Sequence, residues 1–180
     1  QDHQVKPDPS NIYRWVVRYT KQATDAFNGI AISGGSIWVA DETVLRFKSR
    51  HGENVWFWDV IDADSRFLLA SHMPRTRTAR SAKVLMDHAL ERAGGVPPKK
   101  VVTDKLNVYL GGVEDTFGAG AKHVQSDPFK IEDSTSDIER FHGTLKDRTK
   151  VMRALWNMES AQVVMEGWLV HYNFFRPHSG

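Results

Sequence analysis

The stretch Ser36–Asp41 reads Ser-Ile-Trp-Val-Ala-Asp, and it begins the part of this 180-residue chain that is patterned as strands. Its apolar run is typical of a buried strand, and the run ends on a carboxylate. The pattern returns at Val101–Asp104, where Val-Val-Thr precedes aspartate. An uncharged, β-branched run of this kind is typical of a central strand whose carboxyl end carries function. We therefore expect both aspartates to lie at strand ends.

The elements around this stretch follow from hydrophobic periodicity. The expected strands are 36–41, 54–61, 66–71, 100–103 and 122–125. The expected helices are 11–22, 79–93 and a short one near 106–110, followed by a Gly-rich loop at Gly111, Gly112, Gly118 and Gly120. Two helices finish the chain, with apolar stripes at Ile138, Phe141, Leu145, Met152, Leu155 and Trp156 and at Ala161, Val164, Met165, Trp168, Leu169 and Tyr172. This order predicts an α/β fold, an RNase-H-like mixed five-stranded sheet flanked by helices.

A third acid, Glu139, stands at the head of a basic amphipathic stretch. Sixty-two residues lie between Asp41 and Asp104, and thirty-four between Asp104 and Glu139. Strand ends and a helix start can bring such distant acids to one point. Because phosphoryl transfer on nucleic acid can run on two divalent metals held by carboxylates, the trio favours a metal-dependent enzyme that cuts and joins DNA.

The composition excludes several other classes of protein and of functional site. The chain has no cysteine, which excludes disulfides, thiolate catalysis and cysteine-based zinc sites, and its eight histidines show no zinc-site spacing. No apolar run reaches the roughly 20 residues that span a bilayer, and no signal-peptide pattern opens the sequence. A hydrophobic content of 41% and six tryptophans indicate a globular domain. The start at Gln1 suggests a fragment or a processed chain.

Charge is distributed unevenly although the net value is only +2. Four basic residues and no acid occupy Arg75–Lys83, and five basic residues with one acid occupy Arg140–Arg153. Such patches favour a polyanion. A solvated helix face is the alternative for each patch.

The acids have alternatives of their own. Glu42 stands beside Asp41, and Asp59, Asp62 and Asp64 lie on the neighbouring strands, where the last two fit a turn. The spacing Ser136-x-x-Glu139 matches a capping box. On a helical wheel, however, one face separate from the apolar stripe collects Glu139, His142, Lys146, Lys150 and Arg153. A metal-binding glutamate followed by cations suits a bound phosphodiester, and His142 could instead be a metal ligand or a base.

Several motifs together resemble the DDE transposases of bacterial and archaeal insertion sequences, and most closely the insertion-sequence-six family. They are Trp38–Thr43, Asp59–Asp62, Val102–Lys105, Ile138–Arg148 and the tail Tyr172–His178, which reads Tyr-Asn-Phe-Phe-Arg-Pro-His. The resemblance covers about residues 10–180. Asp137 departs from the pattern, because relatives often carry Asn there.

The resemblance implies an RNase-H-like DDE catalytic domain at 36–180 with Asp41, Asp104 and Glu139 as catalytic, metal-binding residues for two Mg²⁺ or Mn²⁺. It also implies DNA contacts, for which the candidates are Lys146, Arg140, His142, Arg148 and Lys150. Residues 1–35 resemble the remnant of an N-terminal helix-turn-helix plus a linker. The family further implies a homodimer or higher oligomer on transposon ends and target DNA, no membrane, and a nucleoid-associated place in prokaryotic cytoplasm.

The function that these inferences favour is metal-dependent cleavage of DNA strands followed by strand transfer. The alternatives are a nuclease of the same fold that only hydrolyses, a non-catalytic domesticated relative that binds DNA, and a structural domain with a Trp-rich interaction surface. Trp56 and Trp58 are expected in the core, because they lie in an apolar strand.

Overall fold

The computed structural model describes residues 6–28, 30, 32–46, 54–127, 134–151 and 158–177. The helices are α1 (Pro9–Asn28), α2 (Ala79–Arg92), α3 (Val108–Phe117), α4 (Ser136–Val151) and α5 (Met158–Phe174), with a short 3₁₀ turn at Gly118–Gly120. The strands are β1 (Ile37–Arg46), β2 (Asn54–Asp62), β3 (Leu68–His72), β4 (Lys100–Thr103) and β5 (Lys122–Gln125). The expected order of elements from the first strand onward is confirmed.

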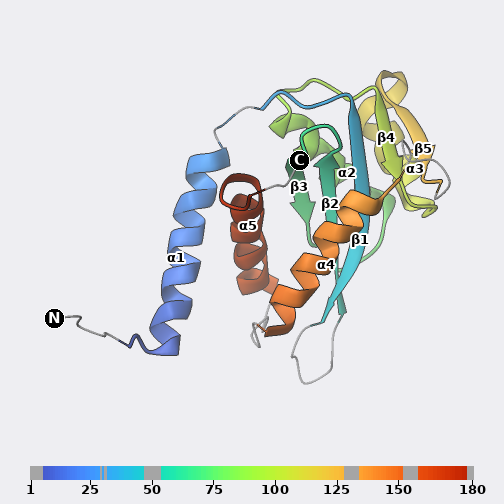
Figure 1. Ribbon diagram of the computed structural model, residues 1–180. Coiled ribbons are helices and arrows are strands. Elements are labelled where there is room, and N and C mark those ends of the chain that lie inside the picture. The colour runs from blue at the N-terminus through green and yellow to red at the C-terminus, as the bar shows by residue number, and fades with distance from the viewer. Residues whose placement is uncertain are drawn as a thin grey trace.

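The five strands form one mixed sheet in the order β3-β2-β1-β4-β5 (Figure 1). The pairs β1–β2 and β2–β3 are antiparallel, whereas β1–β4 and β4–β5 are parallel. The predicted mixed five-stranded sheet is therefore confirmed. β1 lies at the centre of this sheet, between one antiparallel and one parallel neighbour.

Helices cover both faces of the sheet, because successive residues of a strand point to opposite faces. On β1, Val39 and Leu45 join the core under α4 and α5, whereas Trp38 and Ala40 join the core under α2 and α3. Figure 1 shows α4 and α5 together on one side of β1 and β2. The result is three layers, with odd-numbered β1 residues facing α4 and even-numbered ones facing α2 and α3.

The strand β1 continues well beyond the expected end at Asp41. It runs to Arg46 and pairs with β2 from Trp38 to Arg46, with Leu45 opposite Val55. The physical reason is the alternation after the acids, where Thr43 and Leu45 are both buried. Asp41 therefore lies in the middle of a strand, and the expectation of a strand-end position was wrong for this residue.

The segment that was expected to be a Gly-rich loop begins as helix. Gly111 and Gly112 lie inside α3, and a Cβ on Gly112 would stand 2.5 Å from the Cβ of Ala82 and 2.8 Å from backbone atoms of α2. Glycine here permits close contact between two helices, not a turn. The third strand begins two residues later than expected, because Arg66 adopts a positive φ of 59° that an extended strand does not allow.

The helix α1 is longer than the expected 11–22 and packs along α5. Phe27 stacks on Phe174 with ring centroids 4.2 Å apart, and Thr20 lies against Gly167. Apolar side chains in its N-terminal part stay exposed, namely Ile12, Tyr13, Trp15, Val16 and Tyr19. None of the helices in the described ranges is long and apolar enough to cross a membrane.

Some expectations fall outside the described residues. These are the helix-stripe positions Met152, Leu155 and Trp156, the cationic-face residue Arg153, and His178 of the tail. The boundary at residue 35 between an N-terminal remnant and the catalytic domain stays a prediction.

The contact between α2 and α3 yields a stability prediction. Replacing Gly112 with Ala forces the two helices apart, and we expect a loss of about 1–3 kcal/mol in the free energy of unfolding. Gly143 is the matched control, because nothing lies within 4 Å of a Cβ built there; Gly143→Ala should be neutral or should stabilise α4 by up to about 1 kcal/mol. Urea denaturation measures both, and equal stability of the two variants would contradict this account.

Candidate active site

Parallel pairing of β1 with β4 brings two acids together. Ala40 pairs with Thr103, so the residues that follow them, Asp41 and Asp104, lie side by side. With Glu42 they form a group of carboxylates in which one oxygen from each lies within 4.8 Å of the others. Asp41 and Asp104 are both partly exposed to solvent. The expected meeting of these two aspartates is present in the fold.

Glu42 is already engaged by protein donors. It lies on the α3 side of β1, where the Tyr109 hydroxyl donates to Oε2 at 2.8 Å and Arg77 forms an ion pair with Oε1. The Arg77 guanidinium is itself held 4.1 Å from the centroid of the Trp56 ring. Burial raises the pKa of Glu42, against the hydrogen bond from Tyr109, which lowers it. Glu42 therefore closes the inner side of the acidic group.

A buried histidine bridges Asp41 and a second, fully buried aspartate. Asp59 of β2 pairs directly with Asp41 in the sheet and has no exposed surface. His142 of α4 lies between them, with Nε2 2.9 Å from Asp59 and Nδ1 3.5 Å from Asp41. Burial alone would lower the pKa of His142, but the contacts with Asp41 and Asp59 outweigh it and raise the pKa to about 9. Burial raises the pKa of Asp59, opposed by the hydrogen bond with His142.

This position differs from the cationic helix face on which the sequence placed His142. The residue is only 4% exposed, so it offers almost no surface to DNA, and the expected DNA contact of His142 does not fit this position. A signal for Asp59 was present in the sequence. It stands between Phe57 and Ile61 at period two, which marks a core-facing position, and a buried carboxylate there needs a partner.

Glu139 lies one helical turn before His142 but outside the group of three carboxylates. Its side chain is exposed, and its Oε1 accepts a hydrogen bond from the Thr135 hydroxyl at 2.8 Å. The Ser136 N–H donates to Ser134 Oγ at 3.1 Å, so the cap at this helix start differs from the Ser136–Glu139 capping box. Because residues three apart share a helix face, Glu139 lies on the side of α4 that His142 turns toward Asp41.

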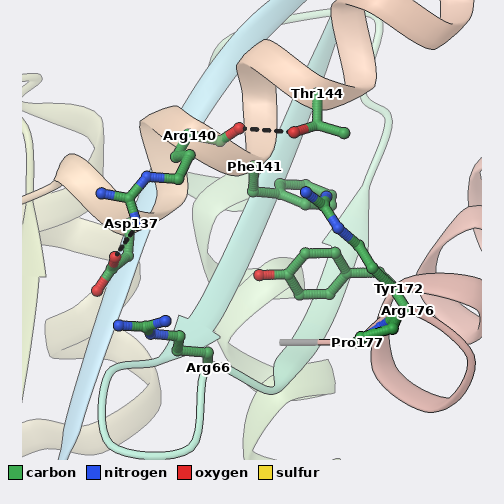
Figure 2. Close-up of a pocket in the computed structure, with 8 residues that line it drawn as sticks. All are labelled: Arg66, Asp137, Arg140, Phe141, Thr144, Tyr172, Arg176 and Pro177. Atoms are coloured by element: carbon green, nitrogen blue, oxygen red, sulfur yellow. Dashed lines mark hydrogen bonds and ion pairs between the residues drawn. The ribbon is translucent and has the colours of Figure 1, made fainter. Parts of the chain in front are cut away.

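Cations line the exposed side of α4. Arg140, Lys146, Arg148 and Lys150 are all exposed, and Arg140 lies 3.4 Å from Asp137. A pocket beside α4 is lined by Arg66, Asp137, Arg140, Phe141, Thr144, Tyr172, Arg176 and Pro177 (Figure 2). Figure 2 shows the side chains of Arg66, Asp137 and Arg140 on the side of the pocket to which the Tyr172 hydroxyl points. These residues come from the β2–β3 turn, α4, the end of α5 and the segment that follows it.

The acidic group fits a hard divalent cation. All of its donors are carboxylate oxygens, which Mg²⁺ and Mn²⁺ prefer. Three carboxylates this close repel one another unless a positive charge lies among them. Arg77 forms an ion pair with Glu42, and His142 Nδ1 lies 3.5 Å from Asp41 Oδ2. The repulsion that remains is between Asp41 and Asp104, where a bound cation would relieve it.

A family of DDE domains, that of IS240-type transposases, matches residues 35–178 of this chain. The chain belongs to this DDE domain family. It is a transposase domain of the polynucleotidyl transferase class, and the match contains all three acids expected from the sequence. No curated protein matched significantly.

The fold of this DDE domain is that of retroviral integrase cores. A chain of the simian T-cell lymphotropic virus intasome, in complex with PP2A regulatory subunit B56 gamma, aligns with TM-score 0.62 and 17% identity over 83% of this chain and 52% of its own. The dimeric HTLV-2 integrase catalytic core domain in complex with magnesium aligns with TM-score 0.58 and 16% identity, over 84% of this chain and 94% of its own. The catalytic core domain of BIV integrase aligns with TM-score 0.54 and 15% identity, over 82% of this chain and 89% of its own. The DDE domain thus spans about half of the intasome chain and nearly all of the isolated core.

The hydrogen bond that the Tyr109 hydroxyl donates to Glu42 yields a stability prediction. Tyr109→Phe keeps the ring beside Trp58, at 5.2 Å between centroids, but removes a hydrogen bond to a carboxylate that is only 4% exposed. We expect a loss of about 1–2 kcal/mol in the free energy of unfolding in metal-free buffer. Tyr13→Phe is the control, because Tyr13 is 42% exposed and should change stability by less than about 0.5 kcal/mol. A variant at Tyr109 as stable as the control would show that this bond contributes nothing.

Proposed function

We propose that this DDE domain catalyses both chemical steps of DNA transposition, cleavage at a transposon end and transfer of that end into target DNA. The observation that carries the proposal is the proximity of Asp41 and Asp104 in a family whose name refers to two aspartates and a glutamate. The related HTLV-2 core, which was solved with magnesium, supports Mg²⁺ as the cofactor, with Mn²⁺ as its substitute.

Asp41 and Asp104 are the residues that would hold the cations, with Glu139 as the third ligand. When bound, two such ions activate the attacking oxygen and stabilise the leaving oxygen of an in-line displacement. For Glu139 to be that ligand, its carboxylate must leave the Thr135 hydroxyl and turn toward Asp41, and its exposed position allows a change of side-chain rotamer. Glu42 keeps its bonds to Tyr109 and Arg77 and shapes the inner wall.

The two steps use one site. In the first, water attacks a phosphodiester at the transposon end, a new P–O bond forms, and the bond to the 3′-oxygen breaks to leave a 3′-hydroxyl. In the second, that hydroxyl loses its proton and attacks a phosphodiester of target DNA. A new P–O bond joins the transposon end to the target, and the bond from that phosphorus to the target's own 3′-oxygen breaks, so that this oxygen takes up a proton and leaves as a 3′-hydroxyl. The chain's own contribution is to hold the acids in place and to position the phosphates.

Exposed cations on α4 are the proposed phosphate contacts. Lys146 stands seven residues beyond Glu139, and Arg140, Arg148 and Lys150 extend the positive surface along the helix. The arginines of the pocket in Figure 2 add positive charge beside Arg140. Such contacts fix the register of DNA without reading its sequence.

The remaining features of the proposal come from the family resemblance. We infer that the protein acts as a homodimer or higher oligomer on transposon ends, in the nucleoid of a prokaryote. We also infer that α1 belongs to an N-terminal helix-turn-helix, for which the exposed apolar side chains in the N-terminal part of α1 are the supporting observation.

Substitutions that replace each acid by its uncharged amide test whether these residues catalyse DNA cleavage and joining. Asp41→Asn, Asp104→Asn and Glu139→Gln should each reduce Mg²⁺-dependent cleavage and joining by about 10³-fold or more, since each removes a ligand worth several kcal/mol in the transition state. Asp115→Asn on the exposed side of α3 is the control and should retain full activity. The assay uses a plasmid that carries both ends of the element, with nicked and joined products separated on sequencing gels.

The products also separate the rival functions. Nicked DNA without joined DNA would indicate a nuclease, and metal-independent binding without cleavage would indicate a non-catalytic relative. Undiminished cleavage by a folded Asp104→Asn variant would contradict the proposed site.

Metal binding is measurable without DNA. At a free Mg²⁺ concentration 100 times its dissociation constant, the wild-type protein should gain about 2.7 kcal/mol of stability. Asp104→Asn should lose most of this gain, yet in EDTA it should be at least as stable as wild type, because one of three mutually repelling carboxylates is gone. Urea denaturation with and without Mg²⁺ checks both statements, and an equal Mg²⁺ response in the two proteins would remove Asp104 from the ligand set.

A further inference from the structure

The central sheet brings two carboxylates into direct opposition. Asp41 and Asp59 are register partners on the antiparallel strands β1 and β2, and both side chains point to the face covered by α4. Like charges directly opposite each other on neighbouring strands destabilise the pair. Asp59 is also completely buried, so it has no solvent to screen its charge. A compensating group on α4 is therefore required at this point.

His142 is that group, and its geometry is suited to two acceptors. A histidine ring carries nitrogens on opposite sides, and here one faces each aspartate, with Nε2 2.9 Å from Asp59 and Nδ1 3.5 Å from Asp41. The residue is 4% exposed, and the ring centroid of the neighbouring Phe141 lies 5.8 Å from that of the imidazole. Its position is thus fixed by packing as well as by polar contacts.

Asp59 is anchored from the opposite side. The Ser71 hydroxyl of β3 donates to its Oδ1 at 2.5 Å, while Oδ2 faces His142. A continuous polar chain therefore runs from β3 through Asp59 and His142 to Asp41. Because Asp59 has no exposed surface, it cannot itself contact DNA or a solvated ion, and its path to Asp41 in this polar chain runs through the histidine.

We propose that Asp59 and His142 form a positioning pair that orients the Asp41 carboxylate toward Asp104 and holds α4 against the sheet at the turn that carries Glu139. The inference rests on the proposed function, since it concerns the same acidic site. Neither residue is a catalytic residue in this account, because neither touches substrate.

Partners of this kind that orient a metal ligand typically change metal affinity or activity 10–100-fold when they are replaced. His142→Asn has too short a side chain to reach both aspartates, so we expect Mn²⁺ affinity to fall about 10–100-fold, as measured by electron paramagnetic resonance titration without DNA. The turnover number for cleavage should fall in parallel, whereas affinity for DNA should stay within about twofold, because the imidazole is buried. His88→Asn is the control, since His88 is exposed on α2 and should bind Mn²⁺ as wild type does.

A double variant separates positioning from simple charge compensation. His142→Asn leaves Asp59 buried without its partner, so the single variant can lose stability for that reason alone. Combining it with Asp59→Asn removes the buried charge and should restore the thermal midpoint. If the pair only compensates charge, the double variant also regains wild-type Mn²⁺ affinity; if it positions Asp41, affinity stays 10–100-fold weaker.

The outcomes distinguish this inference from the proposed function. A folded single or double variant with Mn²⁺ affinity within twofold of wild type would overturn the positioning pair and leave the metal site intact. Failure of the wild-type protein to bind Mn²⁺ would instead overturn the proposed function, and the positioning pair with it.

Discussion

The acidic site depends on the parallel pairing of β1 with β4. A parallel neighbour advances in step with its partner, so the register Ala40–Thr103 carries directly over to Asp41 and Asp104. The antiparallel neighbour β2 runs the other way and places Asp59 opposite Asp41. Asp41 on the central strand therefore has a partly exposed carboxylate, Asp104, on one side and a buried carboxylate, Asp59, on the other. The chemistry of the site follows from this arrangement.

The alternation of side chains divides the supporting residues between the two faces. Asp41 faces α4 and meets His142, whereas Glu42, the next residue, faces α3 and meets Tyr109 and Arg77. Residues on both faces of the sheet therefore contact the same acidic group. The arrangement concentrates negative charge at the surface and spreads its compensation into both cores, where burial makes each polar contact stronger and each missing contact more costly. A site held in this way favours metal binding over maximal stability.

The third acid is held differently. Glu139 lies on an exposed turn at the start of α4, and its carboxylate is bonded to Thr135 of its own segment, whereas Asp41 and Asp104 are fixed by the sheet. One turn further along the same helix, His142 contacts Asp59 of the sheet. An exposed third acid beside two acids that the sheet fixes supports the proposal of a site that completes itself when cation and DNA arrive.

The sequence by itself determined the order of elements and the mixed sheet, because hydrophobic periodicity is a local signal. It also indicated that Asp41 and Asp104 meet, because each follows an apolar run that forms a strand of the sheet. It did not determine that Asp41 lies inside a longer strand, that Gly112 belongs to a helix, or that His142 is buried. These depend on contacts between residues far apart in the chain, namely Leu45 with the α4 layer, Gly112 with Ala82, and His142 with Asp59, 83 positions away. A helical wheel assigns a face from one helix alone, but burial is decided by what packs against that face, and only the tertiary structure supplies this.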